Sequence, residues 1–372
     1  MKLKTVMAMT FIASLAVMSC KQDDNRPEGE TASVYIKIEK AGDRSRATGA
    51  DMSTREVEFT DGYLIFTTGN EIGRIITITD AASGDDQVSV STLEAGATIQ
   101  EVPAATTHVY LYGNLGGSLA GMGTALTVGG SMATVNALTW VLADIQNGTN
   151  DVAIVPVYGD NSVAPDPDNQ GRLKATLDVR PIASRLQIGT IKCTDPEVTK
   201  LELAGIYINS YYHSMDANHS FEDAYLVDHG IDVSKYPTDG YADPYDTMSD
   251  VFSPATDLAA GDATAGTDLY WAYNFFPAHM PHIVLHFTAL ETTGGVTATS
   301  KYATVSKYST TGDGDPTKMV ANAQAGYVYT LDIDITDYET QVTDRPESNS
   351  TVIGHVTITV IDWEGEVIYP EW

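Results

Sequence analysis

The sequence predicts an all-β protein built from two domains. Its 372 residues are 43% hydrophobic and 19% charged, which is enough apolar material for a core, and the length favours more than one domain. Tyrosine (20 residues) and glycine (31 residues) are plentiful, which is typical of strands and turns. Short segments in which apolar and polar residues alternate recur along the chain and are bounded by Gly, Asn and Asp.

The charge balance limits the kinds of partner. Lys and Arg together number 21 and Asp and Glu 50, which gives a net charge of −29. Such a polyanion has no electrostatic attraction for nucleic acid or for an anionic membrane face, so both are excluded as partners. Ordinary hydrophobicity and sparse charge exclude wholesale disorder.

The first residues read as a secretion signal. Lys2 and Lys4 precede an apolar run over 6–17, which ends close to Cys20. The run is too short to span a membrane, so residues 1–19 are predicted to be a signal peptide. A cysteine directly after the cleavage point resembles a bacterial lipobox, whose thiol receives a lipid; ordinary signal cleavage near Cys20 is the alternative. If Cys20 is lipidated, Cys193 is the only thiol left and no intramolecular disulfide can form.

The first strand follows a polar tether over 21–31. Val34, Ile36 and Ile38 alternate with polar or aromatic residues, which predicts a half-buried strand. The loop after it is small, polar and contains Arg44 and Arg46, so we expect it to be exposed and easily cut.

The rest of the first domain is predicted to be strands, with one helix. A helical spacing of apolar residues over 135–145 ends at a Gly and predicts that helix. A Pro- and Asp-rich stretch over 160–171 is expected to link the two domains. The predicted strands are 63–67, 74–79, 108–112 and 151–158.

The second domain is also predicted to be all-β, with a long turn-rich excursion over 211–268 that is dense in Tyr and Asp. Its predicted strands are 173–179, 201–209, 282–288 and 327–335.

Catalytic and metal-binding signals are weak. His282 and His286 share a face of a predicted strand but lie about 13 Å apart, too far to hold one ion, and His279 does not change this. Asp313 and Asp315 resemble the start of a calcium loop, but no closing glutamate follows. Cys193 reads as a structural thiol. The sequence therefore predicts no enzyme, no cofactor and no metal site.

The last segment carries the most information. Val356, Ile358 and Val360 occupy even positions of a strand, after which the apolar residues Ile361 and Trp363 move to odd positions. This phase change requires a bulge, a twist, or two different surfaces that one strand must satisfy.

The two ends of the chain share one β-branched pattern, so one sheet groove could accept either. Cutting at Arg46 would free the strand that contains Val34, Ile36 and Ile38 and expose an apolar groove. The strand that contains Val356, Ile358 and Val360 of the next molecule could then fill it by strand addition. Such head-to-tail contacts do not close on themselves, so a fibre follows.

In this arrangement the sequence resembles the fimbrillins of the Bacteroidales, the pilin subunits of type V pili. The resemblance spans the chain and rests on Cys20, on Arg46-Ala47, on the R-x-x-A motif over 180–183 and on the terminal strand over 356–363, which includes Trp363. It implies two transthyretin-like β-sandwich domains with a swapped C-terminal donor strand, a palmitate-bearing lipoprotein precursor at the outer membrane, and cleavage by an Arg-specific protease.

The resulting organisation is a signal peptide (1–19), a lipidated propeptide with the removable strand (20–46), an N-terminal domain (47–165), a C-terminal domain (166–350) and a donor strand (351–372). The expected function is that of a pilus stalk subunit, supporting adhesion and biofilm formation. The expected partners are further copies of the chain, the protease, tip or anchor pilins, and host or bacterial surface ligands. The alternatives are a tip adhesin, a surface glycan-binding lipoprotein or a secreted hydrolase. A glycan binder would use Tyr211, Tyr212, Tyr241, Tyr245 and Trp271.

Overall fold

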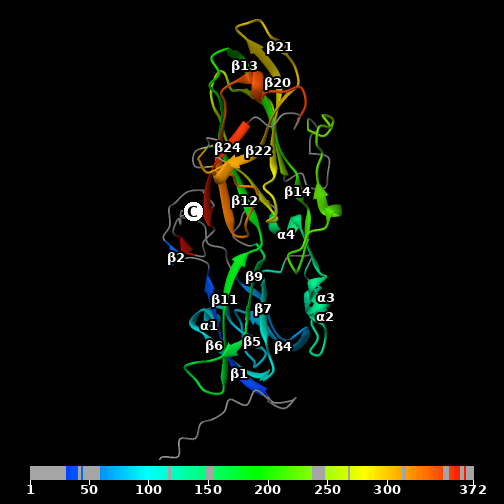
Figure 1. Cartoon of the computed structure of the whole chain (residues 1–372), viewed down its shortest axis with the longest axis vertical. Coiled ribbons are helices and arrows are strands. Elements are labelled where there is room, and N and C mark those ends of the chain that lie inside the picture. The colour runs from blue at the N-terminus through cyan, green and yellow to red at the C-terminus, as the bar shows by residue number, and fades with distance from the viewer. Residues whose placement is uncertain are drawn as a thin grey trace, which may run out of the picture.

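The computed structural model describes residues 31–40, 43–44, 59–115, 119, 121–146, 155–236, 248–266, 269–311, 316–346, 352–360 and 364–365. This part of the chain is mostly β, as the sequence predicts. Two large sheets lie one above the other along the long axis of the molecule (Figure 1). None of the helices in these ranges is long and apolar enough to cross a membrane.

The first sheet builds the N-terminal half of the molecule. Its strand order is β5-β4-β3-β7-β9-β11-β1-β6, with β10 paired to β11. The strands are β1 (Thr31–Lys40), β3 (Asp61–Thr68), β4 (Glu71–Thr79), β5 (Gln87–Val88), β6 (Ala97–Pro103), β7 (His108–Gly113), β9 (Val157–Ser162), β10 (Ala164–Pro165) and β11 (Arg172–Pro181).

The second sheet builds the C-terminal half. Its strand order is β17-β13-β20-β22-β24-β23-β12-β18, with β19 paired to β12 and β21 to β20. The strands are β12 (Ser184–Cys193), β13 (Val198–Asn209), β17 (Ser249–Asp257), β18 (Ala263–Thr264), β19 (Trp271–Phe275), β20 (His282–Thr292), β21 (Thr297–Ala298), β22 (Lys301–Ser309), β23 (Tyr327–Ile335) and β24 (Val352–Val360).

Smaller elements complete the described chain. Three short pairs lie outside the two sheets, and the helices are one or two turns long. The pairs are β2 (Asp43–Arg44) with β25 (Glu364–Gly365), β8 (Thr139–Val141) with β15 (Ser214–Asp216), and β14 (Tyr211–Tyr212) with β16 (Leu226–Val227). The helices are α1 (Val90–Ala95), α2 (Met122–Ala125), α3 (Met132–Asn136), α4 (Leu142–Gln146), α5 (Tyr338–Gln341) and the 3-10 turns η3 (Asp223–Tyr225) and η5 (Pro316–Lys318).

The chain passes from the first sheet to the second after the stretch 160–171 that was expected to be the linker. β11 pairs within the first sheet and β12 within the second, so the chain crosses at Ile182 and Ala183. The stretch 160–171 instead contains the end of β9, β10 and the turn into β11. Pro and Asp mark turns between paired strands as well as linkers, and composition alone does not separate the two.

The single helix predicted over 135–145 is wrong. The structure has α3, then β8, then α4 in this stretch. β8 pairs with β15 from the excursion of the C-terminal half, and its central residue Trp140 is fully buried. A strand partner distant in sequence therefore overrides the helical spacing.

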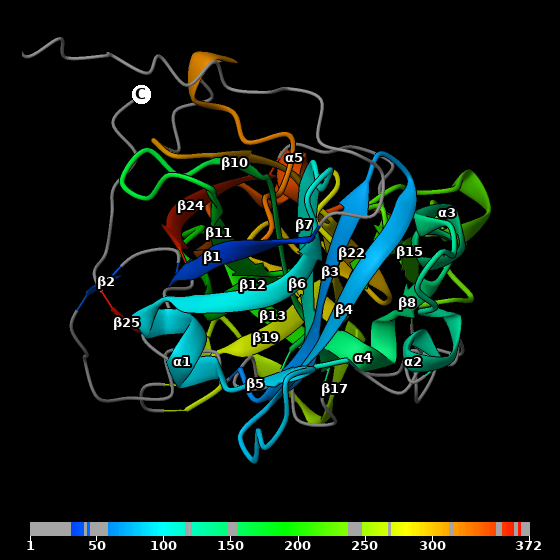
Figure 2. The ribbon, with the colours of Figure 1, turned by 90° about the horizontal axis from the view of Figure 1, so that it is seen from below.

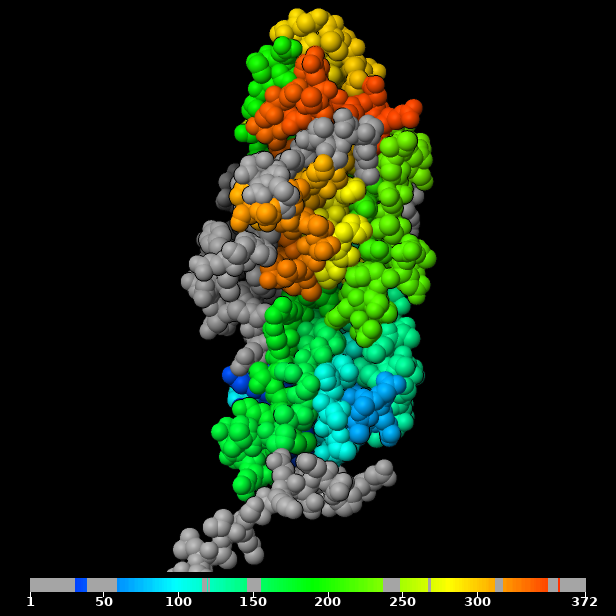
Figure 3. Space-filling model, viewed as in Figure 1, coloured from blue at the N-terminus to red at the C-terminus, as the bar shows by residue number. Residues whose placement is uncertain are grey.

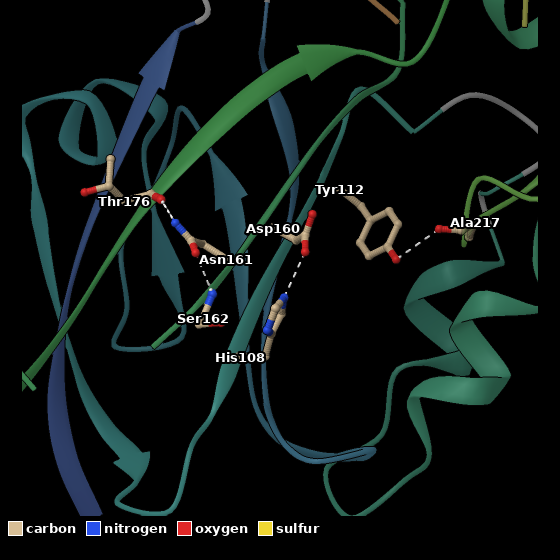
Figure 4. A network of polar contacts seen from close by, with 7 residues as sticks. All are labelled: His108, Tyr112, Asp160, Asn161, Ser162, Thr176 and Ala217. Atoms are coloured by element: carbon tan, nitrogen blue, oxygen red, sulfur yellow. Dashed lines mark hydrogen bonds and ion pairs between the residues drawn. The ribbon is translucent and has the colours of Figure 1, made fainter. Parts of the chain in front are cut away.

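Side chains as well as strands join the two halves. The Tyr112 hydroxyl on β7 donates to the Ala217 carbonyl (3.3 Å), next to the His108–Asp160 pair that links β7 and β9 (2.9 Å; Figure 4). The Asn274 amide of β19 donates to the Ile145 carbonyl of α4 (2.7 Å). One hydrophobic cluster accordingly contains residues of both halves, which stack into an elongated molecule (Figure 3).

Candidate functional site

The candidate site is the position that β1 occupies in the first sheet. β1 lies between β11 and β6 (Figure 2). It runs parallel to β11, from Ser33 opposite Arg172 to Lys40 opposite Val179, and antiparallel to β6. The earliest strand of the described chain is thus an interior strand of its sheet, with a neighbour on each side.

The inner face of β1 belongs to the core of the N-terminal half. Val34 and Ile36 are fully buried and Ile38 is 3% exposed, as the alternation in the sequence predicts. They pack in one hydrophobic cluster with side chains of both neighbouring strands and of α1: Ala97, Ile99, Val102, Leu93, Ala175, Leu177 and Val179. Without β1 these side chains would line an apolar groove.

Two cations lie over Tyr35 on the outer face of β1. The Arg172 guanidinium lies 4.9 Å and the Lys174 ammonium 5.9 Å from the centre of the Tyr35 ring, within the range of cation–π attraction. Both cations come from the register partners of β1 on β11. Sequence reasoning missed this contact because it depends on a parallel pairing between residues about 140 positions apart.

A buried carboxylate holds Arg172 in place. Asp166 accepts from Arg172 Nε (2.7 Å) and from its terminal nitrogen (2.6 Å), and also from the Asp168 backbone N–H (3.0 Å). Desolvation raises the pKa of Asp166, but these hydrogen bonds outweigh it and the pKa lies below the ordinary value. Asp166 therefore supports the turn between β10 and β11 and fixes the position of its arginine.

A glycine makes room for Tyr35. Gly96 ends α1 with a φ of +98°, and a Cβ at this position would overlap the Tyr35 hydroxyl. The position thus needs glycine for its backbone conformation and for the side chain of β1. The strand β6 that follows was not predicted, although Ala97 and Ile99 alternate with Thr98 and Gln100.

β24 is the segment predicted to be the donor strand. It lies inside the second sheet, parallel to β22 and antiparallel to β23. Val356 and Ile358 occupy the positions opposite Leu331 and Tyr329, both of which are buried. In this structure β24 is therefore paired within its own half, and its transfer to another molecule is a proposal.

β1 and β24 occupy equivalent surroundings. Each is an interior strand with one parallel and one antiparallel neighbour, and each carries three β-branched residues at alternate positions. A strand with the direction and pattern of β24 could therefore lie in the place of β1 with the same pairing.

Four predicted site residues lie outside the described residues: Cys20, Arg46, Ala47 and Trp363. The described segments nearest in sequence to Arg46, Ala47 and Trp363 are β2 and β25, which pair in parallel with Asp43 opposite Glu364 and Arg44 opposite Gly365. The chain just before the predicted cleavage point thus lies beside the chain just after Trp363.

The histidines and the thiol have structural surroundings. His279 contacts Ser210, and His286 stacks on Tyr302 at 5.0 Å between ring centres, where burial lowers its pKa. Burial also raises the pKa of the Cys193 thiol, which disfavours the reactive thiolate. Across the described ranges, no three His, Cys, Asp or Glu side chains are placed to share a metal ion.

The three described aromatic residues that were considered for glycan binding pack against other parts of the protein. Tyr211 is buried, Tyr212 lies against Phe221 (4.7 Å), and Trp271 lies edge-on to Phe252 (5.6 Å). Tyr241 and Tyr245 lie outside the described residues.

Sequence comparison finds no relative: no family model matches the chain, and no curated protein matches it.

Solved structures share the fold over about nine-tenths of the chain. A fimbrilin from Porphyromonas gingivalis superposes with a TM-score of 0.50 and 14% identity, over 91% of this chain and 99% of its own. A putative cell adhesion protein from Bacteroides eggerthii gives 0.50 and 14%, over 90% and 98%. One from Parabacteroides distasonis gives 0.50 and 11%, over 92% and 99%. The structural neighbours are thus Bacteroidales fimbrillins and cell adhesion proteins, and at this identity the likeness establishes the fold alone.

Proposed function

We propose that this chain is the structural stalk subunit of a surface pilus, made as an outer-membrane lipoprotein, cleaved after Arg46 and polymerised by donor-strand exchange. In this proposal each half is a transthyretin-like β-sandwich, the partners are other copies of the chain and an Arg-specific protease, and the fibre supports adhesion. Tip or anchor pilins and surface ligands complete the set of partners.

The observation that carries the proposal is the place of β1. The earliest described strand lies in the interior of a sheet, and the sequence that follows it contains Arg44, in β2, and Arg46. One cut after Arg46 separates β1 covalently from the rest of the molecule. β6 and β11 then keep their unpaired backbone groups and their buried side chains on either side of an empty slot.

The slot has a strong preference for a new strand. Burial of three β-branched side chains is worth roughly 5–9 kcal/mol before ordering costs, and each backbone hydrogen bond adds about 0.5–1.5 kcal/mol. An open slot of this kind is aggregation-prone unless a specific strand fills it. The protein therefore needs a donor as soon as β1 has gone.

β24 is the strand that fits. With Val356, Ile358 and Val360 in the places of Val34, Ile36 and Ile38, it repeats the apolar pattern and pairs in parallel with β11. Its departure leaves β22 and β23, which run antiparallel to one another, free to pair directly.

Sequencing the N-terminus of subunits from sheared surface fibres tests the maturation step. The proposal requires an N-terminus at Ala47, or at Ser45 if Arg44 is used. An N-terminus at Cys20 or Lys21 in the assembled fibre would refute removal of β1.

A disulfide trap tests the exchange itself. Thr98 on β6 lies opposite Tyr35 of β1, so the proposed register places Thr357 of the next molecule opposite Thr98. Thr98→Cys with Thr357→Cys, in a Cys193→Ser background, should give a ladder of covalent oligomers on non-reducing gels. The pair Gln100→Cys with Thr357→Cys is the out-of-register control and should cross-link far less. Equal cross-linking by both pairs would contradict the register, and no oligomer from fibres that do form would contradict the exchange.

A further inference from the structure

A cavity of about 530 Å³ lies between the two halves, at the end of β11. The N-terminal half contributes Tyr158, Asp160, Asp178 and Arg180 to its walls, together with Pro181 and Ile182. The C-terminal half contributes Met215, His219, Pro277 and the turn over 323–325.

The cavity opens on the outer face of the first sheet. Leu177, Val179 and Pro181 of β11 are buried on the inner face, whereas Asp178 and Arg180 project from the opposite face. At this end of β11 a loop of the C-terminal half lies beside the outer face: Gly326 N–H donates to the Ala183 carbonyl (2.8 Å), and a Cβ at Gly326 would lie 3.9 Å from the Arg180 Cβ. Asp178 and Arg180 keep about half of their side-chain surface exposed, so a side chain of a strand beside β11 can reach both of them and that loop.

The walls suit a large aromatic side chain with one hydrogen-bond donor. The rings of Tyr158 and His219 meet edge to face at 4.2 Å, and burial lowers the pKa of His219, which favours the neutral imidazole. The Arg180 guanidinium is held beside the cavity by Asp178, where it can lie over a π-system. Asp160 and Gln324 provide acceptors for an N–H group. Among side chains, an indole combines these requirements.

The register of β1 shows which residue of an incoming strand reaches this place. β1 runs in parallel register to Lys40 opposite Val179, so one residue further along lies beside Arg180 on the outer face. When Val356, Ile358 and Val360 take the places of Val34, Ile36 and Ile38, the residue beside Arg180 is Trp363. A shift of two residues in either direction would put Gly354 or Asp362 into the apolar core, which disfavours both alternatives.

We infer that the cavity between the halves is the receptor for Trp363 of a second copy of this chain, which enters it when the donor strand replaces β1. The inference rests on the proposed function and names one of its contacts. It also accounts for the phase change after Val360: the even positions fill the inner core, and the next odd positions lie on the outer face beside the cavity.

Complementary substitutions test the receptor. Trp363→Ala should leave cleavage and fibre formation possible but make subunits leave the fibre at least about tenfold faster, as expected for a buried aromatic anchor. Ala325 is a half-buried wall residue, and Ala325→Trp should fill the cavity and have a similar effect. The double variant should release subunits no faster than Ala325→Trp alone, because the competing indole is gone. The Trp363→Phe variant should release subunits at a rate between those of the unchanged protein and Trp363→Ala.

A second disulfide pair identifies the occupant directly. Ala325→Cys with Trp363→Cys, in a Cys193→Ser background, should give covalent oligomers from fibres, whereas Ala325→Cys with Tyr369→Cys should not. An intramolecular disulfide in the monomer with no oligomer would mean that the chain's own tail fills the cavity, and would overturn the inference. Stable fibres with unchanged release rates in every variant would also overturn it while leaving strand exchange intact. Failure of the unmodified processed chain to form fibres would instead refute the proposed function.

Discussion

Tyr35 and Gly96 show how single residues fix β1 in its slot. Gly96 has a φ of +98° and a Cβ there would collide with Tyr35, whereas Gly69, in the β3–β4 turn with a φ of +59°, faces open space. Gly96→Ala should therefore destabilise the uncleaved precursor by about 2–4 kcal/mol and Gly69→Ala by about 1–2 kcal/mol in denaturant unfolding. In the cleaved chain without β1 the difference between the two variants should shrink, because Tyr35 has left. A difference of equal size before and after cleavage would mean that Tyr35 does not press on Gly96.

Asp166 is the second residue whose role can be tested alone. Asp166→Asn removes the charge that holds Arg172 over Tyr35, and we expect a lower melting temperature for the precursor at neutral pH. Because the folded-state pKa of Asp166 is depressed, its stabilisation is complete above the unfolded value of about 3.9 and is lost as pH falls through the folded value. The difference in melting temperature between Asp166→Asn and the unchanged protein should accordingly vanish at strongly acid pH. If the difference in melting temperature persists at strongly acid pH, it comes from packing and not from the charge of Asp166.

For single residues of β1, the sequence predicts which side chains are buried but not which side chains of other strands cover them. The alternation at Val34, Ile36 and Ile38 predicts their burial, and the structure confirms it. This prediction is possible because the two-residue period of a strand can be recognised from neighbouring residues alone. The cover on Tyr35 by Arg172 and Lys174 depends on a pairing between distant strands and has no local signal.

The sequence identifies most strands well, but it does not show which strands pair with one another. The segments that contain β3, β4, β7, β13, β20 and β23 were all predicted as strands, whereas β6 and β22, which flank β1 and β24, were not. The helix predicted over 135–145 failed for the same reason: β15 of the other half pairs with its centre. Local pattern gives the state of a segment, and tertiary pairing decides the exceptions.

Isolated peptides give the cleanest test of the donor element. Deletion of 351–372 would also remove β24 from the interior of its own sheet, so loss of assembly by that variant would have two explanations. A synthetic peptide of residues 352–364 avoids this, and we expect it to bind the cleaved subunit and to block fibre growth. Binding should be measurable by fluorescence anisotropy of the labelled peptide, and the uncleaved precursor should not bind.

Two substitutions in that peptide test which face enters the slot. Ile358→Asp places a carboxylate opposite the apolar groove, and the desolvation cost of several kcal/mol should abolish binding. Thr357→Asp lies on the other face, in the place of Tyr35 beside Lys174, and should bind nearly as well as the unchanged peptide. Equal loss from both substitutions would mean that the strand is buried on two faces along this part of the slot.

In the proposed mechanism the slot of β1 and the donor strand β24 lie in different halves of the molecule. The slot lies in the first sheet and β24 in the second, and the halves are stacked along the long axis (Figure 1). Their separation favours transfer between molecules arranged head to tail over closure within one molecule. The sequence predicts the two equivalent ends, but not that β24 is an interior strand of its own sheet, since strand order across a sheet has no signature in local pattern.

A head-to-tail fibre has two different ends, and this leads to a prediction about how its growth stops. The Arg46→Ala variant keeps β1 in its slot, so it can give its β24 to the slot at a fibre end but offers no slot to the next subunit. Mixed in small proportion with cleavable subunits, it should therefore cap that end, and the mean fibre length in electron micrographs should fall as its fraction rises.

A variant with Arg46→Ala and Ile358→Asp is the control, because it can neither accept a strand nor donate one and should leave the fibre length unchanged. Shortening by both variants to the same degree would mean that capping does not use the donor strand. Normal fibres assembled from Arg46→Ala alone would show that Arg44 is cut in its place, or that cleavage is not required, and sequencing the subunit's N-terminus would separate these outcomes.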